Sequence, residues 1–128
     1  MWVCPASGAG GALAKQIPPQ VRRVVAERAE RDAGYPACEI MQPGVCQGQV
    51  QHWHHRRLRS QGGEHSVENG LGVCQACHDY LHKHTGEAYA RGWLVRGWKK
   101  PGEQPVLMRG KWVRLNEHGT WINEKESE

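Results

Sequence analysis

The chain has 128 residues, of which 38% are hydrophobic, and its formal net charge at pH 7 is +4. This length allows one domain with a modest core and excludes two domains of ordinary size. No apolar run approaches the roughly 20 residues of a membrane-spanning helix, and the N-terminal residues lack the basic and apolar segments of a signal peptide. We therefore expect a cytoplasmic protein, in which closely spaced Cys and His bind metal rather than form disulfides.

The N-terminal part of the chain predicts an arm followed by a helix. Residues 1–16 are rich in Gly and Ala without an apolar period, so we expect a flexible arm in which Cys4 is a spare thiol. From Gln20 to about Asp32, apolar residues recur at steps of three and four and predict an amphipathic helix that Gly34 ends. The loop that follows contains Pro, Gly and Cys, so its order would have to come from a cross-link or a metal.

The middle of the chain predicts two short strands and a helix. Residues 49–55 and 71–73 have the composition of strands, and a long polar loop separates them. The segment from Gln75 to about His84 has helical character. The predicted order of elements is therefore ββα.

The C-terminal part predicts short elements of both kinds. Residues 87–91 indicate a helical turn and residues 93–95 an extended segment. Beyond them, strand-type alternation at residues 106–108, 112–115 and 121–122 predicts a small β appendage, and the chain ends in an acidic tail. The fold class is α+β. The predicted organisation is an arm at 1–16, a domain at 17–95 with its core at 38–84, and the β appendage with the tail at 96–128.

Four cysteines make a candidate metal set. Cys74 and Cys77 form the tighter pair, because a two-residue spacer lets two thiolates turn toward one ion. Cys38 and Cys46 form a second pair, in a loop whose Pro and Gly residues can fold it back. Together the pairs predict one structural zinc ion. Buried free thiols or a Cys38–Cys46 disulfide are the alternatives, which a reducing compartment and a core without Phe disfavour.

Three histidines make a second candidate set. His78 and His82 stand at positions i and i+4 of the predicted helix, so both imidazoles project from one face and can share an ion. His54 offers a third nitrogen, and three protein ligands with an open position suit a catalytic metal. Surface histidines are the alternative interpretation. Four further histidines are expected to be bystanders: His52, His65, His84 and His118.

The neighbouring residue His55 suits a different role. Side chains that are adjacent on a strand point to opposite faces, so His55 would stay free of the ion that His54 binds. A neutral imidazole could then take a proton from water. A kink or a bulge at the end of the strand would let both histidines serve one phosphate.

These residues resemble the HNH endonucleases, also known as the His-Me finger or ββα-metal family. The resemblance rests on His55, Asn69 and His78, in a pattern of two adjacent His, a long loop with two Gly, Asn, Cys-x2-Cys-His and a His four positions later. It covers about residues 38–84. The wider chain looks like small HNH proteins encoded by bacteriophages and prophages.

The resemblance implies a ββα-metal core and hydrolysis of DNA phosphodiester bonds. It implies that His55 is the general base and that Asn69 holds the loop and so orients this base. It further implies that His78 binds the catalytic divalent ion, with His54 and His82 as the other ligands, as in the nuclease colicins. Many family members carry Asp where His54 stands, and three imidazoles suit zinc, nickel or another transition ion better than magnesium. Zinc, nickel, manganese and magnesium all stay open.

The arginines of the first half of the chain would place positive charge near this site: Arg22, Arg23, Arg28, Arg31, Arg56, Arg57 and Arg59. The last three follow the expected base directly and could clamp DNA phosphates, although loop arginines are also an ordinary solvated surface. We therefore expect a metal-dependent endonuclease that nicks or cuts duplex DNA. The looser resemblance to phage proteins adds terminase or other packaging proteins as candidate partners. The alternative is a zinc-stabilised module that binds DNA or a packaging partner without cleaving, and an RNA-directed or homing activity is a weaker third interpretation.

Overall fold

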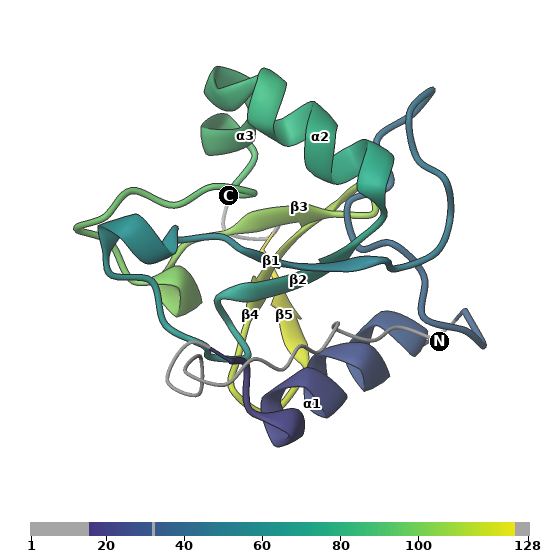
Figure 1. Ribbon diagram of the computed structural model, residues 1–128, viewed down its shortest axis with the longest axis horizontal. Coiled ribbons are helices and arrows are strands. Elements are labelled where there is room, and N and C mark those ends of the chain that lie inside the picture. Colours follow the sequence, from purple (N-terminus) through teal and green to yellow (C-terminus); the bar gives the residue numbers. More distant parts are fainter. Residues whose placement is uncertain (1–15, 32, 125–128) are drawn as a thin grey trace.

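The computed structural model describes residues 16–31 and 33–124, and Figure 1 shows how its elements are arranged. The fold is α+β, with helices packed against small antiparallel sheets. The predicted arm with Cys4 and the acidic tail fall almost wholly outside the described residues. Within them, no helix is long and apolar enough to cross a membrane. In chain order, with η for a short 3-10 helix, the elements are α1 (Pro19–Glu30), β1 (His52–His55), η2 (Arg59–Gln61), β2 (Gly70–Val73), α2 (Gln75–Lys83), α3 (Thr85–Ala90), η3 (Pro101–Glu103), β3 (Val106–Met108), β4 (Lys111–Leu115) and β5 (Trp121–Asn123).

Helix α1 begins one residue before the predicted start. Pro19 has the fixed φ of a first helical position, and it has no N–H that would be left without a partner there. Val25 and Ala29 are fully buried on one face, as the apolar spacing predicted. The helix ends at Glu30, two residues early, and the N–H of Gly34 (φ +83°) donates to the Glu30 carbonyl at 3.1 Å.

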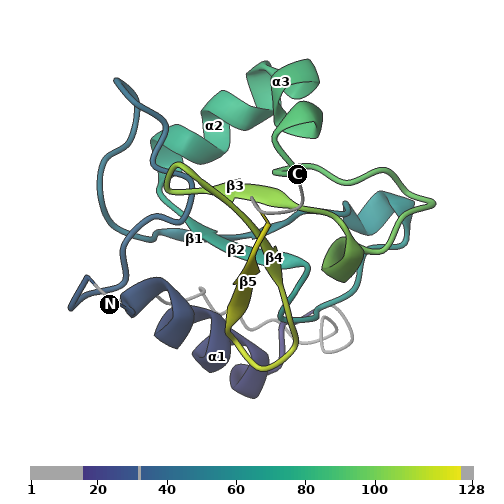
Figure 2. The same ribbon diagram turned by 180° about the vertical axis from the view of Figure 1, so that it is seen from behind.

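Strands β1 and β2 form an antiparallel pair in the middle of the molecule. Trp53 lies opposite Gly72 and His55 lies opposite Gly70. Gly70 is required at its position, because a Cβ atom there would lie 2.1 Å from the ring of Trp53. Figures 1 and 2 show α2 on one side of this pair and α1 on the other. The side chains of β1 therefore alternate between the two helices, and Trp53 packs with Val25 of α1.

Strand β1 is shorter than predicted at its N-terminal end. Gln49 pairs with Ala37 instead, and the N–H of Val50 donates to the carbonyl of Pro36 at 2.9 Å. The first residues of the predicted strand thus hold the preceding loop. The bounds of β2 and α2 lie within one residue of the prediction.

The sheet of β3, β4 and β5 shares one hydrophobic core with β2 and α2. Val106 and Val113 of this sheet are fully buried in one cluster with Leu71 of β2 and Leu81 of α2. Its strands match the predicted ones to within one residue. The predicted β appendage is therefore a layer of the core, packed directly against the ββα segment. The extended segment predicted at residues 93–95 is buried in the same region but forms no strand.

Arg109 fixes the turn between β3 and β4 to the rest of the chain. It adopts a positive φ of 51°, and its guanidinium donates to three backbone carbonyls. These are Ala29 at 2.6 Å, Ala37 at 2.6 Å and Cys38 at 3.1 Å. The end of α1 and the start of the cysteine loop are thereby held against this sheet.

Candidate metal centres

The four predicted zinc ligands lie together in the structure. The sulfur atoms of Cys38, Cys46, Cys74 and Cys77 are all within 4.8 Å of one another, and those of Cys46 and Cys74 are 3.9 Å apart. Four ligands at about 2.3 Å from one ion in a tetrahedron place their sulfur atoms about 3.8 Å apart. All four thiols are free, so the Cys38–Cys46 disulfide considered from the sequence is not formed. The set could hold a metal ion.

The long spacer between Cys38 and Cys46 is folded back by residues with positive φ, including Met41 at 51° and Gly44 at 78°. Backbone N–H groups then point at the sulfur atoms: Gly48 donates to Cys46 at 3.3 Å, and Cys74 donates to Cys38 at 3.4 Å. Such donors stabilise thiolates, which are the form of cysteine that binds metal.

The cysteine thiols do not share one acidity. A hydrogen bond from the Cys77 thiol lowers the pKa of Cys38 to about 5, and the same hydrogen bond raises the pKa of Cys77. Burial raises the pKa of Cys46 to about 11. Without a cation, the chain therefore favours a Cys38 thiolate beside protonated Cys46 and Cys77 thiols. A divalent cation would favour deprotonation of the whole set, because ligation and proton release are coupled.

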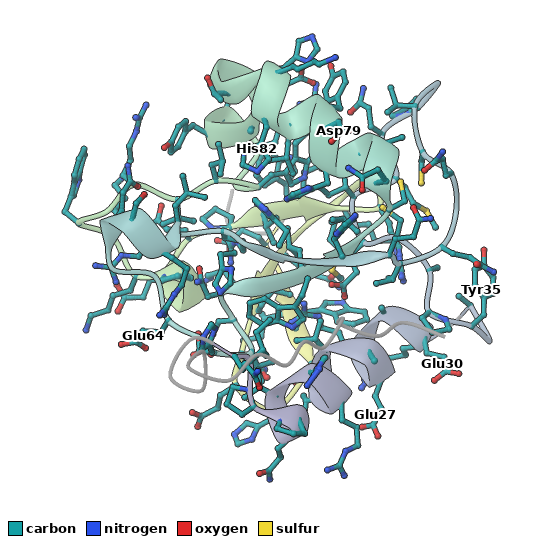
Figure 3. The ribbon with its side chains drawn as sticks, viewed as in Figure 1. Glu27, Glu30, Tyr35, Glu64, Asp79 and His82 are labelled. Carbon is teal, nitrogen blue, oxygen red and sulfur yellow. The ribbon has the colours of Figure 1, made fainter. Side chains whose placement is uncertain are left out.

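The three predicted histidines also lie together. His78 and His82 stand one turn apart on α2, and the ring of His54 on β1 lies with its centroid 5.3 Å from that of His78 and 5.5 Å from that of His82. Figure 3 labels His82 on α2. One ring nitrogen of each lies within 4.8 Å of the others, and the ring centroids of His78 and His82 are 4.7 Å apart. His54 is 2% exposed whereas His82 is exposed, so the set opens to solvent on one side. This set could also hold a metal ion.

The orientation of His54 is fixed by Trp93. Nε2 of His54 lies 2.8 Å from the carbonyl oxygen of Trp93. Because a carbonyl only accepts, Nε2 carries the proton and Nδ1 keeps the lone pair that a metal would need. Burial lowers the pKa of His54 to about 3 and that of His78 to about 4. Both imidazoles are therefore neutral at pH 7, which is the form that binds metal.

His55 lies on the other face of β1. The ladder is regular from His52 to His55, so the kink or bulge considered from the sequence is absent from this strand. The rings of His55 and Trp53 meet edge to face with centroids 4.8 Å apart, and Nε2 of His55 lies 3.1 Å from Nδ1 of His65. Burial, followed by the charges of His65 and Arg59, lowers the pKa of His55 to about 4. His55 is thus neutral at pH 7 and able to accept a proton.

Asn69 closes the loop that starts directly after His55. This side chain is 1% exposed, and its Oδ1 accepts from the N–H of Arg57 at 2.6 Å. Its Nδ2 donates to the carbonyls of Arg57 at 3.1 Å and Glu64 at 2.9 Å. One side chain therefore ties both ends of this loop to the start of β2. Gly63 is needed in the loop, because a Cβ there would lie 1.6 Å from the Arg57 carbonyl oxygen.

The loop arginines differ in exposure, and Arg56 corrects the sequence prediction. Arg56 is fully buried, so its guanidinium cannot reach a phosphate. Arg28 of α1 is also fully buried and forms a two-pronged ion pair with Glu39 at 2.7 and 2.8 Å. Arg59 is exposed and Arg57 is half-buried. The acceptors of Arg56 are four backbone carbonyls: Gly92 at 2.9 Å, Glu68 at 3.1 Å, Pro101 at 3.0 Å and Gln104 at 3.0 Å.

Two histidines expected to be bystanders lie beside the candidate ligands. His65 contacts His55, as described above. The ring of His52 stacks on that of His78 with centroids 5.3 Å apart, and its Nε2 hydrogen-bonds to Gln75. His52 could have been found from the sequence, because it shares a strand face with His54. No local pattern marks His65, which the folding of the loop brings to His55.

Comparison with known proteins leaves the function to be argued from these residues. Searches against protein-family models, curated proteins and solved structures each return no match for this chain.

Proposed function

We propose that this protein is a metal-dependent endonuclease that hydrolyses DNA phosphodiester bonds, as in the HNH family that its sequence resembles. The proposal depends on one observation: His54, His78 and His82 converge between β1 and α2, and a neutral, half-buried His55 follows His54 on β1. A module stabilised by metal alone needs the four cysteines but has no use for this second set.

The donor atoms favour particular ions. Four thiolates suit a structural zinc ion, and three imidazoles suit zinc, nickel or another transition ion better than magnesium. When bound at the histidines, such an ion would neutralise charge developing on the phosphate and the leaving oxygen. The chain's own residues must then supply the proton acceptor and the contacts to flanking phosphates.

His55 is our proposed proton acceptor. Its contacts with Trp53 and His65 hold the ring, and Asn69 holds the backbone that follows it. A positioned base of this kind typically contributes about 10² to 10⁴ in rate. Of the three arginines that follow His55, Arg59 is the most exposed and is therefore the one we propose to contact a flanking phosphate.

The test is conversion of supercoiled plasmid to nicked or linear DNA in the presence of a panel of divalent ions. We expect cleavage with at least one transition ion, a loss of about 10²-fold or more in His55→Ala, and loss in His78→Ala and His82→Ala. His118→Ala is the matched control, because His118 lies exposed in the turn before β5. Unchanged activity in His55→Ala, or no activity with any ion, would contradict the proposal.

A second candidate is a module that binds DNA or a packaging protein without cleaving it. The observation that favours it is the regular strand, which sends His55 to the face opposite His54. This candidate predicts that DNA binding survives simultaneous Ala substitution of His55, His78 and His82. A role beside phage packaging proteins remains a prediction from the resemblance.

A further inference from the structure

Residues 96–100, here named the Trp98 loop, carry an exposed tryptophan among basic side chains. Trp98 is 79% exposed, more than any other large hydrophobic residue of the described chain. Arg96, Lys99 and Lys100 are also exposed, and the loop has no acidic residue. An exposed aromatic side chain with cations beside it is suited to stack on a flat group of an anionic partner.

The Trp98 loop lies beside the loop that follows His55. Trp93 accepts the hydrogen bond from His54, and two residues later the N–H of Val95 donates to the carbonyl of Arg56 at 2.8 Å. Gly97 then lies against η2, where an added Cβ would be 3.2 Å from Cβ of Gln61. Figures 1 and 2 show both segments extending together to the same edge of the molecule. The Trp98 loop therefore packs against the loop that directly follows His55.

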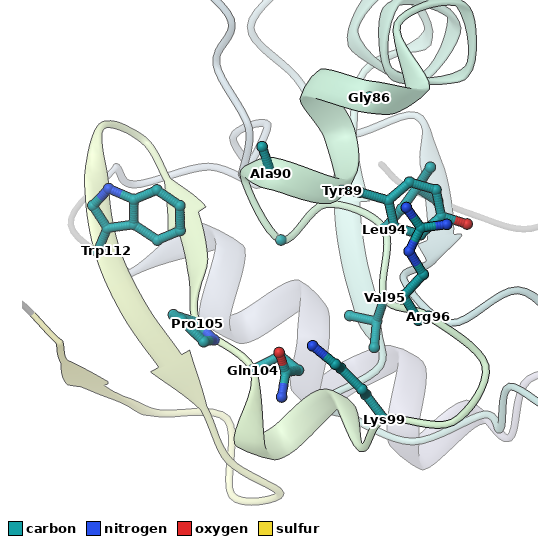
Figure 4. Close-up of a pocket in the computed structure, with 11 residues that line it drawn as sticks. Gly86, Tyr89, Ala90, Leu94, Val95, Arg96, Lys99, Gln104, Pro105 and Trp112 are labelled. Carbon is teal, nitrogen blue, oxygen red and sulfur yellow. The ribbon is translucent and has the colours of Figure 1, made fainter.

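Behind this loop is a cavity of about 420 Å³ between α3 and β4, drawn in Figure 4. Tyr89 and Trp112 line it together with Arg96 and Lys99. The guanidinium of Arg96 stacks over the ring of Tyr89 at 3.7 Å from the centroid. Aromatic and cationic side chains thus line the cavity together, and Arg96 and Lys99 come from the loop that also carries Trp98. Surfaces that bind single strands have this pattern, with bases on the aromatic faces and the backbone along the cations.

We propose that the Trp98 loop binds unpaired nucleotides, with Trp98 stacked on a base and the neighbouring cations against the adjoining phosphates. The inference rests on the proposed endonuclease function and deepens it by naming the substrate class, which is DNA with a single-stranded gap, overhang or branch near the scissile bond. Paired DNA keeps its bases stacked on one another, so Trp98 would first have to unstack a base step at a cost in free energy. Unpaired bases remove this cost.

The experiment measures binding in a His55→Ala background, so that cleavage does not interfere and the metals stay in place. Fluorescence anisotropy compares a blunt duplex with the same duplex carrying a short single-stranded gap. We expect Trp98→Ala to weaken binding to the gapped DNA by at least about fivefold, and binding to the blunt duplex by less than about twofold. Trp98→Tyr should retain most of the affinity, because tyrosine also stacks.

Two control variants separate stacking from charge and from surface aromatics in general. Tyr35→Ala removes another exposed aromatic residue, 42% exposed and on the opposite edge of the molecule from the Trp98 loop (Figure 3), and should leave both affinities unchanged. Lys99→Ala should weaken binding to both DNAs alike, because a phosphate contact does not distinguish them. Thermal unfolding should be the same for all four variants.

The inference is overturned if Trp98→Ala weakens neither DNA or both equally, or if Tyr35→Ala has the same effect as Trp98→Ala. Its failure is distinguishable from failure of the proposed function. If no ion supports plasmid cleavage, the proposed endonuclease function is wrong. The effect of Trp98→Ala on binding to gapped DNA can still be measured in that case. If cleavage depends on His55 but binding does not change in Trp98→Ala, only the proposed preference for unpaired nucleotides is wrong.

Discussion

The backbone carbonyl of Trp93 fixes the orientation of the His54 ring. The side chain of Trp93 holds this carbonyl in place. The indole N–H of Trp93 donates to the carbonyl of Leu107 at 2.8 Å, and the residue is 1% exposed. The fixed carbonyl selects the tautomer of His54 with the proton on Nε2 and leaves Nδ1 for a metal. In metal sites, such a hydrogen bond to the second ring nitrogen orients the histidine and raises its affinity for the ion.

Asn69 offers a sharp test at the level of one residue. Asn69→Ala should destabilise the protein by about 1–3 kcal/mol, because it leaves the backbone groups of Arg57 and Glu64 without their partners. Asn69→Asp keeps the acceptor for the Arg57 N–H but loses both donors. Urea unfolding measures the free energy, and plasmid cleavage measures the activity.

If Asn69 positions the loop after His55, both variants should cleave more slowly than their residual folded fraction explains. Asn69→Asp should be at least as impaired as Asn69→Ala, because its buried carboxylate would face the carbonyl oxygens of Arg57 and Glu64. Cleavage reduced only in proportion to the folded fraction would leave Asn69 a purely structural residue.

The sequence predicts single residues well where neighbours along the chain decide their place. His78 and His82 share a helix face by spacing alone, and the structure brings His54 to them. The burial of Arg56 was missed, because it depends on carbonyls up to 48 positions away. An arginine in a polar loop looks solvated until its acceptors are known.

At the level of elements, helix α2 carries ligands of both candidate sets. Cys74 precedes its first residue, and the sulfur atom accepts from the N–H of Cys77 at 3.3 Å as an N-terminal cap. His78 follows immediately and His82 one turn later. The strands and α2 could be predicted from local periodicity and turn residues. The packing of β3 and β4 into the shared core could not, because apolar alternation does not reveal which surface a strand covers.

Arg56 links elements that the sequence separates, and a matched pair of variants tests this role. Arg56→Met should lower the free energy of unfolding by about 3 kcal/mol, because buried carbonyls lose their donor. Arg59→Ala removes an exposed side chain with one hydrogen bond, to the Gly63 carbonyl at 2.9 Å, and should lower the free energy of unfolding by no more than about 1 kcal/mol. Urea unfolding checks both values.

DNA affinity provides the second readout for this pair. Arg59→Ala should weaken DNA binding and reduce its dependence on salt, as loss of a phosphate contact does. If the Arg56→Met protein is as stable as the parent but binds DNA more weakly, Arg56 contacts a phosphate and its structural role is contradicted.

At the scale of the whole molecule, polar links complement a small apolar core. The buried pair of Arg28 and Glu39 joins α1 to β2, because Arg28 also donates to the carbonyl of Gly70 at 2.6 Å and Glu39 accepts from the N–H of Gly72 at 2.9 Å. Arg109 adds the β3–β4 turn to the same region. The sequence, with no Phe and little apolar surface to bury, predicts that such a fold needs a metal for stability.

A variant that cannot hold zinc at the cysteine set tests this expectation. Cys77→Ser should abolish zinc retention and cooperative unfolding, because a structural zinc site contributes about 10–16 kcal/mol in small domains, as much as the whole stability of an ordinary one. Cys4→Ser is the matched control and should retain both. Elemental analysis gives the zinc content, and circular dichroism follows thermal unfolding. A folded Cys77→Ser protein without zinc would show that the core is sufficient by itself.

The adjacency of Cys77 and His78 would couple the two proposed metal sites. Cys74 caps the first turn of α2, and an ion at the cysteines would fix this turn, from which His78 and His82 reach His54. We therefore expect metal affinity at the histidines to fall when the cysteine set is empty. If the proposed endonuclease function holds, a cell short of zinc should accumulate inactive protein even when the second ion is abundant.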